Sequence, residues 1–411
     1  MLALLPGIAL ALLALAPGSA SAQPLACGQT ITKDTTLHAD LGPCPGDGLV
    51  IGADNVTLDL NGHAILGNGA HNGDDVGVKD EGHDGADIEN GEIRGFRSDV
   101  KLDANQSRTR GITARLGTSD GGAAFSVSGS YNSIENNVAR GQTWESHGFD
   151  IAGSHNTLSD NASRGLGGVT VRGWRNAVTH NVLVDAEFGG LSVWGPRNLI
   201  AGNSVRGSES PLWVTGPGNV IRKNHSGIYA TDSPALMSLV VSGDCRNVRV
   251  KENVLRNGMS VGCQSARIEG NTLFGAGIVL GGSDTLVREN TVSGAHAWEY
   301  VGIALHGGSD NSIVKNTISQ ADYSGIFVGG GSVGTNVEGN LVRQSGFGPS
   351  PYPVHNDDGI HVEDAGTVIA NNRANFNFDL GIQAVSGVID GGGNTAVGNG
   401  DPRQCLNVVC N

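Results

Sequence analysis

The segment from Asp357 to Glu363 brings carboxylates and a histidine together in a way that suits acid and base chemistry. Asp357, Asp358, His361 and Glu363 stand there, and His355 precedes them by two residues. Carboxylates a few ångströms apart separate each other's pKa values, so one can act as an acid while its neighbour acts as a base. We call this group the C-terminal patch. Because Asp-Gly before a strand is also common turn chemistry, a purely structural role is the alternative.

A second group, which we call the N-terminal patch, combines acid, base and cationic side chains with tryptophans. His147 and Lys101 are candidate bases, Asp150 is a candidate acid, and Arg172 could neutralise a bound carboxylate. Trp194 and Trp213 follow in the next repeats, and exposed indole rings offer flat apolar surfaces to sugar rings. Tryptophans that only cover the edges of the fold are the alternative.

The two patches also supply candidate binding residues and metal ligands. Candidate substrate-binding side chains are Trp194, Trp213, Trp298, Phe327, Tyr352, His306, Glu145 and Glu187. Ca²⁺ takes six to eight oxygen ligands, and its candidate ligands are Asp357, Asp358 and Glu363. No Cys and His spacing indicates zinc, and no Gly-rich phrase has the strand–turn–helix context of a nucleotide site.

A repeat predicts the elements that position these residues. An Asn-containing phrase, such as NTLSDN ending at Asn161 or NLIAGN ending at Asn203, recurs roughly every 18 to 32 residues from Asn137 to Asn372. Between these phrases, Gly-led stretches such as GVTVRG and GIHVED alternate apolar and polar residues, which is a strand signal. Such coils bury their apolar faces only by stacking. We therefore expect an all-β fold, a single right-handed parallel β-helix with the Asn residues in a hydrogen-bonded ladder at a turn.

The alternation in each Gly-led strand predicts which side chains face outward. Lys101 is expected on the same outward row, two coils before Asp150. The first outward position of successive coils is predicted to hold Asp150, Thr170, Ser192, Trp213, Val240, Ser260, Val279, Ala304, Phe327, His361 and Gln383.

Six cysteines, an even number, indicate disulfides in an exported chain. Cys245 and Cys263 each follow the same strand of successive repeats, so we expect them to stack one coil apart and to be bonded. Cys27 with Cys44, and Cys405 with Cys410, are expected to tie down the two ends.

Composition and chain order set the remaining expectations. Residues 1–22 form an apolar run that ends in small residues, as a secretory signal peptide does. Residues 23–47 are expected to form an N-terminal cap, 48–395 the β-helix and 396–411 a C-terminal cap. The net charge of −14 argues against nucleic acid and acidic membrane surfaces as partners, and no later run predicts membrane insertion.

The chain resembles the secreted bacterial right-handed parallel β-helix repeat proteins of the pectin-lyase-like and NosD-like kind. The resemblance lies in Cys27-Gly28, in the stretch from Cys44 to Gly48, in the phrase from Asn55 to His63, and in the repeats. It covers essentially the whole mature chain and implies the fold more strongly than a reaction. Pectate and alginate lyases, polygalacturonases and mannuronan epimerases share that fold, and Asn356-Asp-Asp-Gly is similar to a polygalacturonase segment.

Three functions remain open at this stage. The first is a polysaccharide lyase or C5-epimerase acting on a uronate-containing polysaccharide, with His147, His361 or Lys101 as base and Arg172 or calcium as neutraliser. The second is a glycoside hydrolase that uses paired carboxylates. The third is a glycan-binding surface protein that catalyses nothing.

Overall fold

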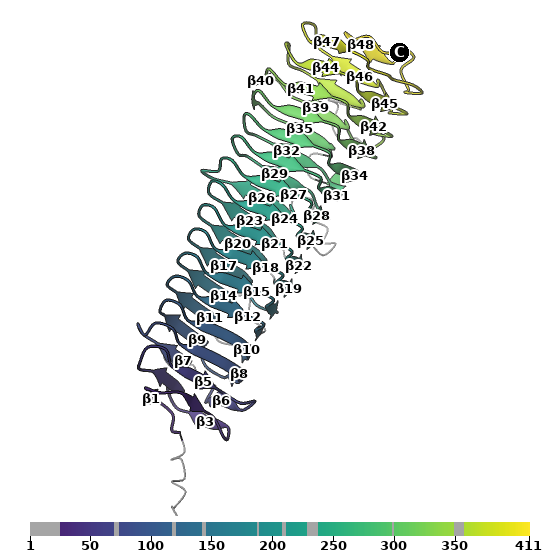
Figure 1. The fold of residues 1–411 in the computed structure, drawn as a ribbon. Coiled ribbons are helices and arrows are strands. Elements are labelled where there is room, and N and C mark those ends of the chain that lie inside the picture. Colours follow the sequence, from purple (N-terminus) through teal and green to yellow (C-terminus); the bar gives the residue numbers. More distant parts are fainter. Residues whose placement is uncertain are drawn as a thin grey trace, which may run out of the picture.

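The chain folds into a long right-handed parallel β-solenoid, which Figure 1 shows as a stack of coils from the N-terminal to the C-terminal end. It is seen in a computed structural model that describes residues 25–69, 74–116, 121–141, 145–186, 189–207, 211–227, 237–297, 300–348 and 357–411. These residues contain no helix long and apolar enough to cross a membrane. The predicted all-β fold is confirmed.

Sheet A is the face that carries both patches, and its seventeen described strands are all parallel. Each strand pairs with the strand one coil before it and the strand one coil after it, as β17 does with β14 and β20. In chain order they are β1 (Gln29–Ile31), β4 (Leu49–Ile51), β7 (Val76–Asp80), β9 (Ser98–Asp103), β11 (Ala123–Ser128), β14 (His147–Ala152), β17 (Val169–Arg172), β20 (Leu191–Trp194), β23 (Leu212–Thr215), β26 (Leu239–Ser242), β29 (Met259–Val261), β32 (Ile278–Leu280), β35 (Ile303–Leu305), β39 (Ile326–Val328), β43 (Ile360–Val362), β46 (Ile382–Ala384) and β48 (Cys405–Leu406).

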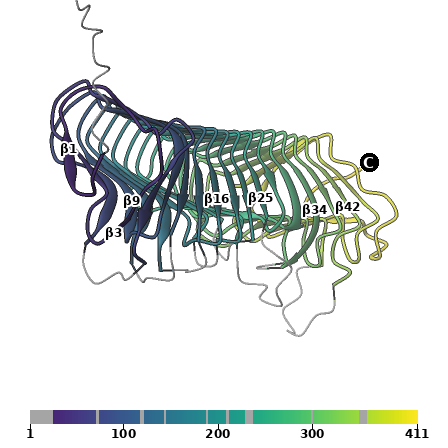
Figure 2. The same ribbon diagram turned by 90° about the horizontal axis from the view of Figure 1, so that it is seen from below.

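Two further ladders, B and C, close each coil, and Figure 2 shows the coils stacked along the axis. Ladder B contains β2 (Thr35–Thr36), β5 (Thr57–Asp59), β8 (Asp87–Arg94), β10 (Arg108–Arg115), β12 (Ser133–Glu135), β15 (Thr157–Ser159), β18 (Ala177–Thr179), β21 (Leu199–Ala201), β24 (Val220–Arg222), β27 (Arg249–Lys251), β30 (Arg267–Glu269), β33 (Leu286–Arg288), β37 (Ser312–Val314), β41 (Asn336–Glu338), β44 (Val368–Ala370) and β47 (Ile389–Gly392). Ladder C contains β3 (Leu41–Cys44), β6 (Ala64–Gly67), β13 (Val138–Arg140), β16 (Ala162–Arg164), β19 (Val182–Val184), β22 (Ser204–Arg206), β25 (His225–Gly227), β28 (Val254–Leu255), β31 (Thr272–Ala276), β34 (Thr291–Ala297), β38 (Thr317–Ser319), β42 (Leu341–Arg343) and β45 (Arg373–Asn375), and the long strands β8 and β10 run through both ladders. A small pair, β36 (Gly308–Ser309) and β40 (Ser332–Val333), lies outside them.

The core is a set of apolar rows that run along the solenoid axis. In sheet A the inward residues of successive strands align, and Phe125 stacks on Phe149 with ring centroids 4.8 Å apart. Leu191 and Leu212 continue the same row and are fully buried. Burying one such side chain is worth about 1.5–3 kcal/mol, and no single coil could do so alone.

The Asn ladder is confirmed at the turn between ladders B and C. Each buried Asn accepts a hydrogen bond at Oδ1 from the backbone N–H of the Asn one coil earlier, as Asn181 does from Asn161 at 3.0 Å. Its Nδ2 donates to a carbonyl of the previous coil, here Leu158 at 2.8 Å. The residue before each Asn takes a positive φ, 57° at Asp160 and 56° at His180, which makes the turn tight. The ladder runs from Asn137 through Asn161, Asn181, Asn203, Asn224, Asn253, Asn271, Asn290, Asn316, Asn340 and Asn372 to Asn394.

All three predicted disulfides are present. Cys245 and Cys263 stack across adjacent coils with Cα atoms 5.0 Å apart, and the other two bonds are Cys27–Cys44 and Cys405–Cys410. Residues 23–47, expected to form a cap, also contribute coil strands. Strand β1 pairs with β4, and β3 pairs with β6, so the described part of this region continues the solenoid.

Candidate functional site

The outward row of sheet A has the register that the repeat predicts. Cα pairing aligns Asp150 with Thr170, Ser192, Trp213 and so on to His361 and Gln383. Lys101 pairs with Ser126, which pairs with Asp150, so Lys101 lies two coils before Asp150 as expected. The two patches therefore lie on one face, with Trp213 and His361 six strands apart, about 29 Å at the usual strand spacing.

The C-terminal patch is organised around His361 on β43. Its Nδ1 lies 2.7 Å from Asp358 Oδ2, and the two side chains are 8% and 2% exposed. Asp358 Oδ1 accepts the backbone N–H of Leu380 at 3.1 Å. An ionised Asp358 fixes the imidazole with its proton on Nδ1, and this leaves the Nε2 lone pair free to take a proton.

The free side of the imidazole faces Glu363. His361 Nε2 lies 3.7 Å from Glu363 Oε1, and the Glu363 side chain is 43% exposed. Burial is the main cause that raises the pKa of Asp379, which lies next to this cluster. The negative charges of Asp358 and Asp401 raise that pKa further. The arrangement is thus a buried carboxylate, an oriented imidazole and an exposed carboxylate in line, which can move a proton between solvent and a bound group.

Aromatic rings continue the C-terminal patch along the outward row. Phe327, one coil before His361, stacks on it with ring centroids 5.9 Å apart. His306 contacts the Phe327 ring at 5.8 Å. The carbonyl of Asp357 accepts a hydrogen bond from Asp379 at 3.2 Å, so its backbone is part of the turn. Four candidate residues, Glu187, Trp298, Tyr352 and His355, lie outside the described residues.

The geometry of the C-terminal patch does not favour the expected calcium site. Both oxygens of Asp358 are already hydrogen-bonded within the fold, to His361 and to Leu380. Among the residues that the structure describes, no group of three or more His, Cys, Asp or Glu side chains is placed to hold a metal ion. Asp357, Asp358 and Glu363 therefore do not converge as ligands, and calcium stays a prediction.

Arg172 and Asp150 of the N-terminal patch are paired with each other across adjacent coils, whereas Lys101 is paired within its own strand. Arg172 Nη2 lies 2.6 and 2.8 Å from the two oxygens of Asp150, with side chains 52% and 26% exposed. Lys101 Nζ lies 3.6 Å from Asp103, which the sequence analysis did not single out. Such half-exposed pairs contribute about 0–1 kcal/mol, so a ligand carboxylate could displace Asp150 from Arg172 at little cost.

Two tryptophans of the N-terminal patch form an exposed shelf next to this ion pair. Trp194 pairs with Arg172, which lies one coil earlier, and Trp194 is 47% exposed. Trp213, on the following strand, is 36% exposed. His147 is the first residue of β14 and stands, like Phe149, at an inward-facing position of that strand. Its Nδ1 is buried without a partner among the described residues. Glu145 is exposed. The shelf, rather than His147, is the accessible part of this patch.

A column of rings at the turn after sheet A was not anticipated. Tyr131 stacks on His155 at 4.7 Å, His155 meets Trp174 edge-on at 4.7 Å, and Arg175 lies over the Trp174 ring at 5.0 Å. Tyr131, His155 and Arg175 occupy equivalent positions after successive strands, and this spacing is the signal that the sequence offers. Tyr131 and Trp174 are 60% and 43% exposed, so the column stays partly open to solvent.

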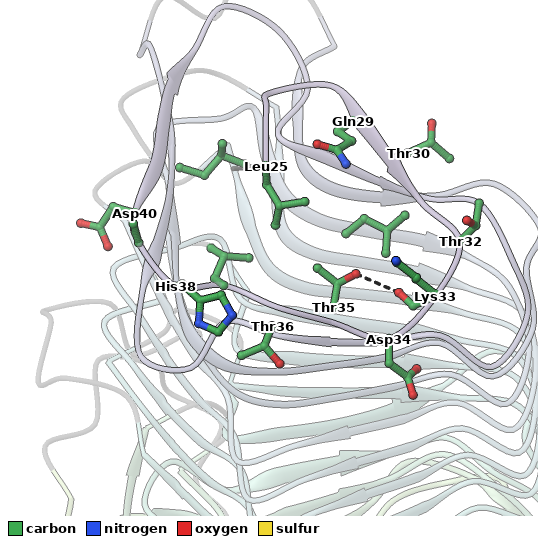
Figure 3. Close-up of a pocket in the computed structure, with 14 residues that line it drawn as sticks. Leu25, Gln29, Thr30, Thr32, Lys33, Asp34, Thr35, Thr36, His38 and Asp40 are labelled. Carbon is green, nitrogen blue, oxygen red and sulfur yellow. Dashed lines mark hydrogen bonds between the residues drawn. The ribbon is translucent and has the colours of Figure 1, made fainter. Parts of the chain in front are cut away.

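A cavity of about 670 Å³ opens at the N-terminal end of the solenoid (Figure 3). It is lined only by the first coil, with Ile31, Leu37 and Leu41 as its apolar floor and polar side chains such as Lys33 and Asp34 around it. Thr35 donates to the carbonyl of Lys33 at 2.8 Å, within this rim. The cavity lies at the N-terminal end of the described core, at the opposite end of the solenoid from His361.

Comparisons with known proteins agree with this fold. Residues 204–399 match the family model described as the right handed beta helix region. No curated protein matches the chain. Among solved structures, the chain is similar to the Dettilon tailspike protein (14% identity, 79% of this chain and 61% of that chain, TM-score 0.39) and to a PL6 alginate lyase in complex with a trisaccharide (12%, 94% and 91%, 0.40). It is also similar to PfbA, a surface adhesin of Streptococcus pneumoniae, with 9% identity over 76% of this chain and 83% of that chain and a TM-score of 0.38. At these identities and TM-scores, none of the three structures supports a function for this chain.

Proposed function

We propose that this chain, a right-handed parallel β-helix repeat protein, is a secreted enzyme that removes the C5 proton of a uronate residue in an acidic polysaccharide. The observation that carries the proposal is the Asp358–His361 pair on the outward face of sheet A. Three disulfides agree with an oxidising, extracellular location.

His361 has the features of a general base. Asp358 holds Nδ1, so Nε2 can accept the C5 proton. In β-elimination the C5–H electrons form a C4–C5 double bond, the C4–O bond breaks, and the leaving oxygen takes a proton from solvent. In epimerisation the carbanion is instead reprotonated at C5 from the opposite side.

The rest of the outward row could hold the polymer. Trp194 and Trp213 offer apolar faces to sugar rings. In a polymer bound along the row, these rings would be several sugar units away from the unit at His361. Arg172 offers a guanidinium to one carboxylate of the polymer if Asp150 is displaced. Paired-carboxylate hydrolysis is less well supported, because the oxygens of Asp358 are committed within the fold.

The test is ultraviolet absorbance on alginate, pectate, glucuronan and glycosaminoglycans, with and without Ca²⁺, together with deuterium exchange at C5. His361→Ala should lower the rate by about 10²–10⁴-fold, the usual contribution of a positioned base. Asp358→Asn should lower it too and change its pH profile, because an amide cannot fix the tautomer. His225→Ala, on the exposed face of β25, is the matched control. Turnover that survives His361→Ala at the original rate would refute the assignment.

A second candidate is glycan binding without turnover. The observation that favours it is the difference in solvent exposure, since His361 is only 6% exposed while Trp194 and Trp213 are open to solvent. This function predicts binding that depends on the tryptophans, no unsaturated product, no deuterium at C5, and indifference to Asp358→Asn.

A further inference from the structure

A cavity of about 710 Å³ lies on another side of the solenoid, beyond the ends of the ladder C strands in the last coils. Strands β34, β38, β42 and β45 lie side by side there (Figure 1). The residues that shape it are His296, Asp322, Gln344, Phe347, Phe376 and Phe378. None of its lining residues belongs to a strand of sheet A, so it is separate from the proposed active face.

Three phenylalanine rings form the apolar walls of this cavity although each is open to solvent. Phe347, Phe376 and Phe378 are 62%, 57% and 53% exposed, and Phe347 meets Phe378 edge-on at 5.5 Å. Exposed aromatic rings gathered at one hollow on a soluble protein indicate contact with a ligand.

Phe376 also has a backbone conformation that its side chain disfavours. Its φ is 58°, in the left-handed region where Asn and Gly are common and bulky residues are outliers. The next coil makes room for the ring with Gly398, where an added Cβ would lie 2.7 Å from the Phe376 ring. The positive φ itself belongs to the coil turn, since it recurs at the equivalent residues Gln320 (58°) and Gln344 (54°) of the two preceding coils. What distinguishes this coil is that the position holds an exposed aromatic ring.

The polar groups in the cavity define the chemistry of the ligand. His296 Nδ1 lies 2.6 Å from Asp322 Oδ1, so the imidazole is oriented, and the amides of Gln320 and Gln344 lie in the same lining. The described lining contains no Lys or Arg. An anionic sugar would therefore meet a carboxylate without a compensating cation, whereas a neutral one finds donors and acceptors for its hydroxyls.

We propose that this cavity is a second binding site, specific for a neutral sugar of one or two rings. The apolar faces of the sugar would lie against Phe347, Phe376 and Phe378, and its hydroxyls would bond to His296, Asp322 and the glutamines. Its volume is within the range of small-ligand sites. The site thus differs in ligand charge from the acidic polymer proposed for sheet A, and it does not depend on that function.

The test is saturation-transfer NMR of the full chain with cellobiose, maltose, lactose and mannobiose, and with digalacturonate as the charged counterpart. At least one neutral disaccharide should bind, and Phe347→Ala and Phe376→Asn should each weaken binding at least tenfold. Phe274→Ala is the matched control, because Phe274 is a 45% exposed phenylalanine on β31 outside the cavity. His361→Ala should leave this binding unchanged, which separates it from any failure of the proposed enzyme.

Phe376→Asn distinguishes binding from packing. Asn accommodates a positive φ, so this variant should melt at the same temperature as the parent chain or higher while losing the sugar. The proposal is overturned if no neutral disaccharide binds, if both variants bind as the parent does, or if digalacturonate binds as well and is lost in the same variants.

Discussion

Replacing Asn203 with Ala would break the Asn ladder near the middle of the solenoid. Its Oδ1 accepts the backbone N–H and the side-chain amide of Asn181, both at 3.0 Å. Its Nδ2 donates to the carbonyl of Val178 at 2.8 Å and to Asn224 at 3.0 Å. Asn203 itself is fully buried, so water cannot replace these partners in the intact fold.

The expected loss of stability follows from the group left without a partner. The Asn181 N–H would be orphaned, whereas the Val178 carbonyl keeps its partner in the β18–β21 ladder, the Asn181 amide keeps its bond to Leu158, and Asn224 keeps the Asn203 N–H. A buried polar group left unsatisfied costs about 1–3 kcal/mol, so the expected loss is about 1–3 kcal/mol.

The assay is guanidinium unfolding followed by circular dichroism and tryptophan fluorescence, with amide hydrogen exchange at Asn181. Exchange is included because long repeat arrays can unfold in parts. Asn336→Ala is the control, since Asn336 is half-buried with one side-chain bond, to Glu338 at 3.2 Å, and should cost less than about 0.5 kcal/mol. A loss below about 1 kcal/mol for Asn203→Ala, with unchanged protection at Asn181, would refute the reasoning.

Three further predictions concern the shelf, the central disulfide and a buried acid. Trp194→Ala and Trp213→Ala should each weaken glycan binding by about 0.5–1.5 kcal/mol with little change in melting temperature; a large drop in melting temperature would mean that the rings are packed. Cys245→Ser should cost about 2–4 kcal/mol and expose one thiol at Cys263, and an unchanged melt with no new thiol would exclude the bond. Burial raises the pKa of Asp99 well above its usual value of 3.8. The folded chain then keeps a proton that the unfolded chain loses, so stability falls as pH rises above about 4, until the folded pKa is passed. Asp99→Asn should remove that fall in melting curves taken across this range, and an identical pH dependence would disprove it.

The fold could be predicted in detail because the repeat defines register at every coil. Alternation with a period of two decides which residues face outward, and the Asn phrase sets one coil against the next. The outward row from Asp150 to Gln383 and the Cys245–Cys263 bond both follow from that alignment.

A second Asn ladder was missed although its signal was present. Each phrase begins as well as ends with Asn, and Asn132, Asn156, Asn176, Asn198 and Asn219 are linked by backbone-to-Oδ1 bonds of 2.7–2.8 Å. Both Asn positions recur with the same spacing, so the reasoning that predicts one ladder predicts the other as well.

The candidate site was harder to predict, because its contacts depend on turns whose geometry the alternation does not describe. Sequence placed Asp358 near His361 but could not show that Asp358 is buried and committed to the Leu380 N–H. The spacing puts His296 and Asp322 at equivalent positions of adjacent coils, but it could not show that their side chains contact each other. Similarly, nothing in the spacing showed that Arg172 is held by Asp150.

The position of the ladder turn within each coil has a consequence for how such a chain can change during evolution. From the outward residue of sheet A to the ladder Asn the interval stays between eleven and thirteen residues, with eleven from Thr170 to Asn181 and thirteen from Val240 to Asn253. From the ladder Asn to the next outward residue it varies from seven, between Asn253 and Ser260, to twenty-one, between Asn340 and His361. Insertions and deletions are thus accepted in one arc of the coil, beside the face that carries His361, while the buried amide ladder is left intact. A scaffold arranged in this way can acquire and lose specificities without having to refold.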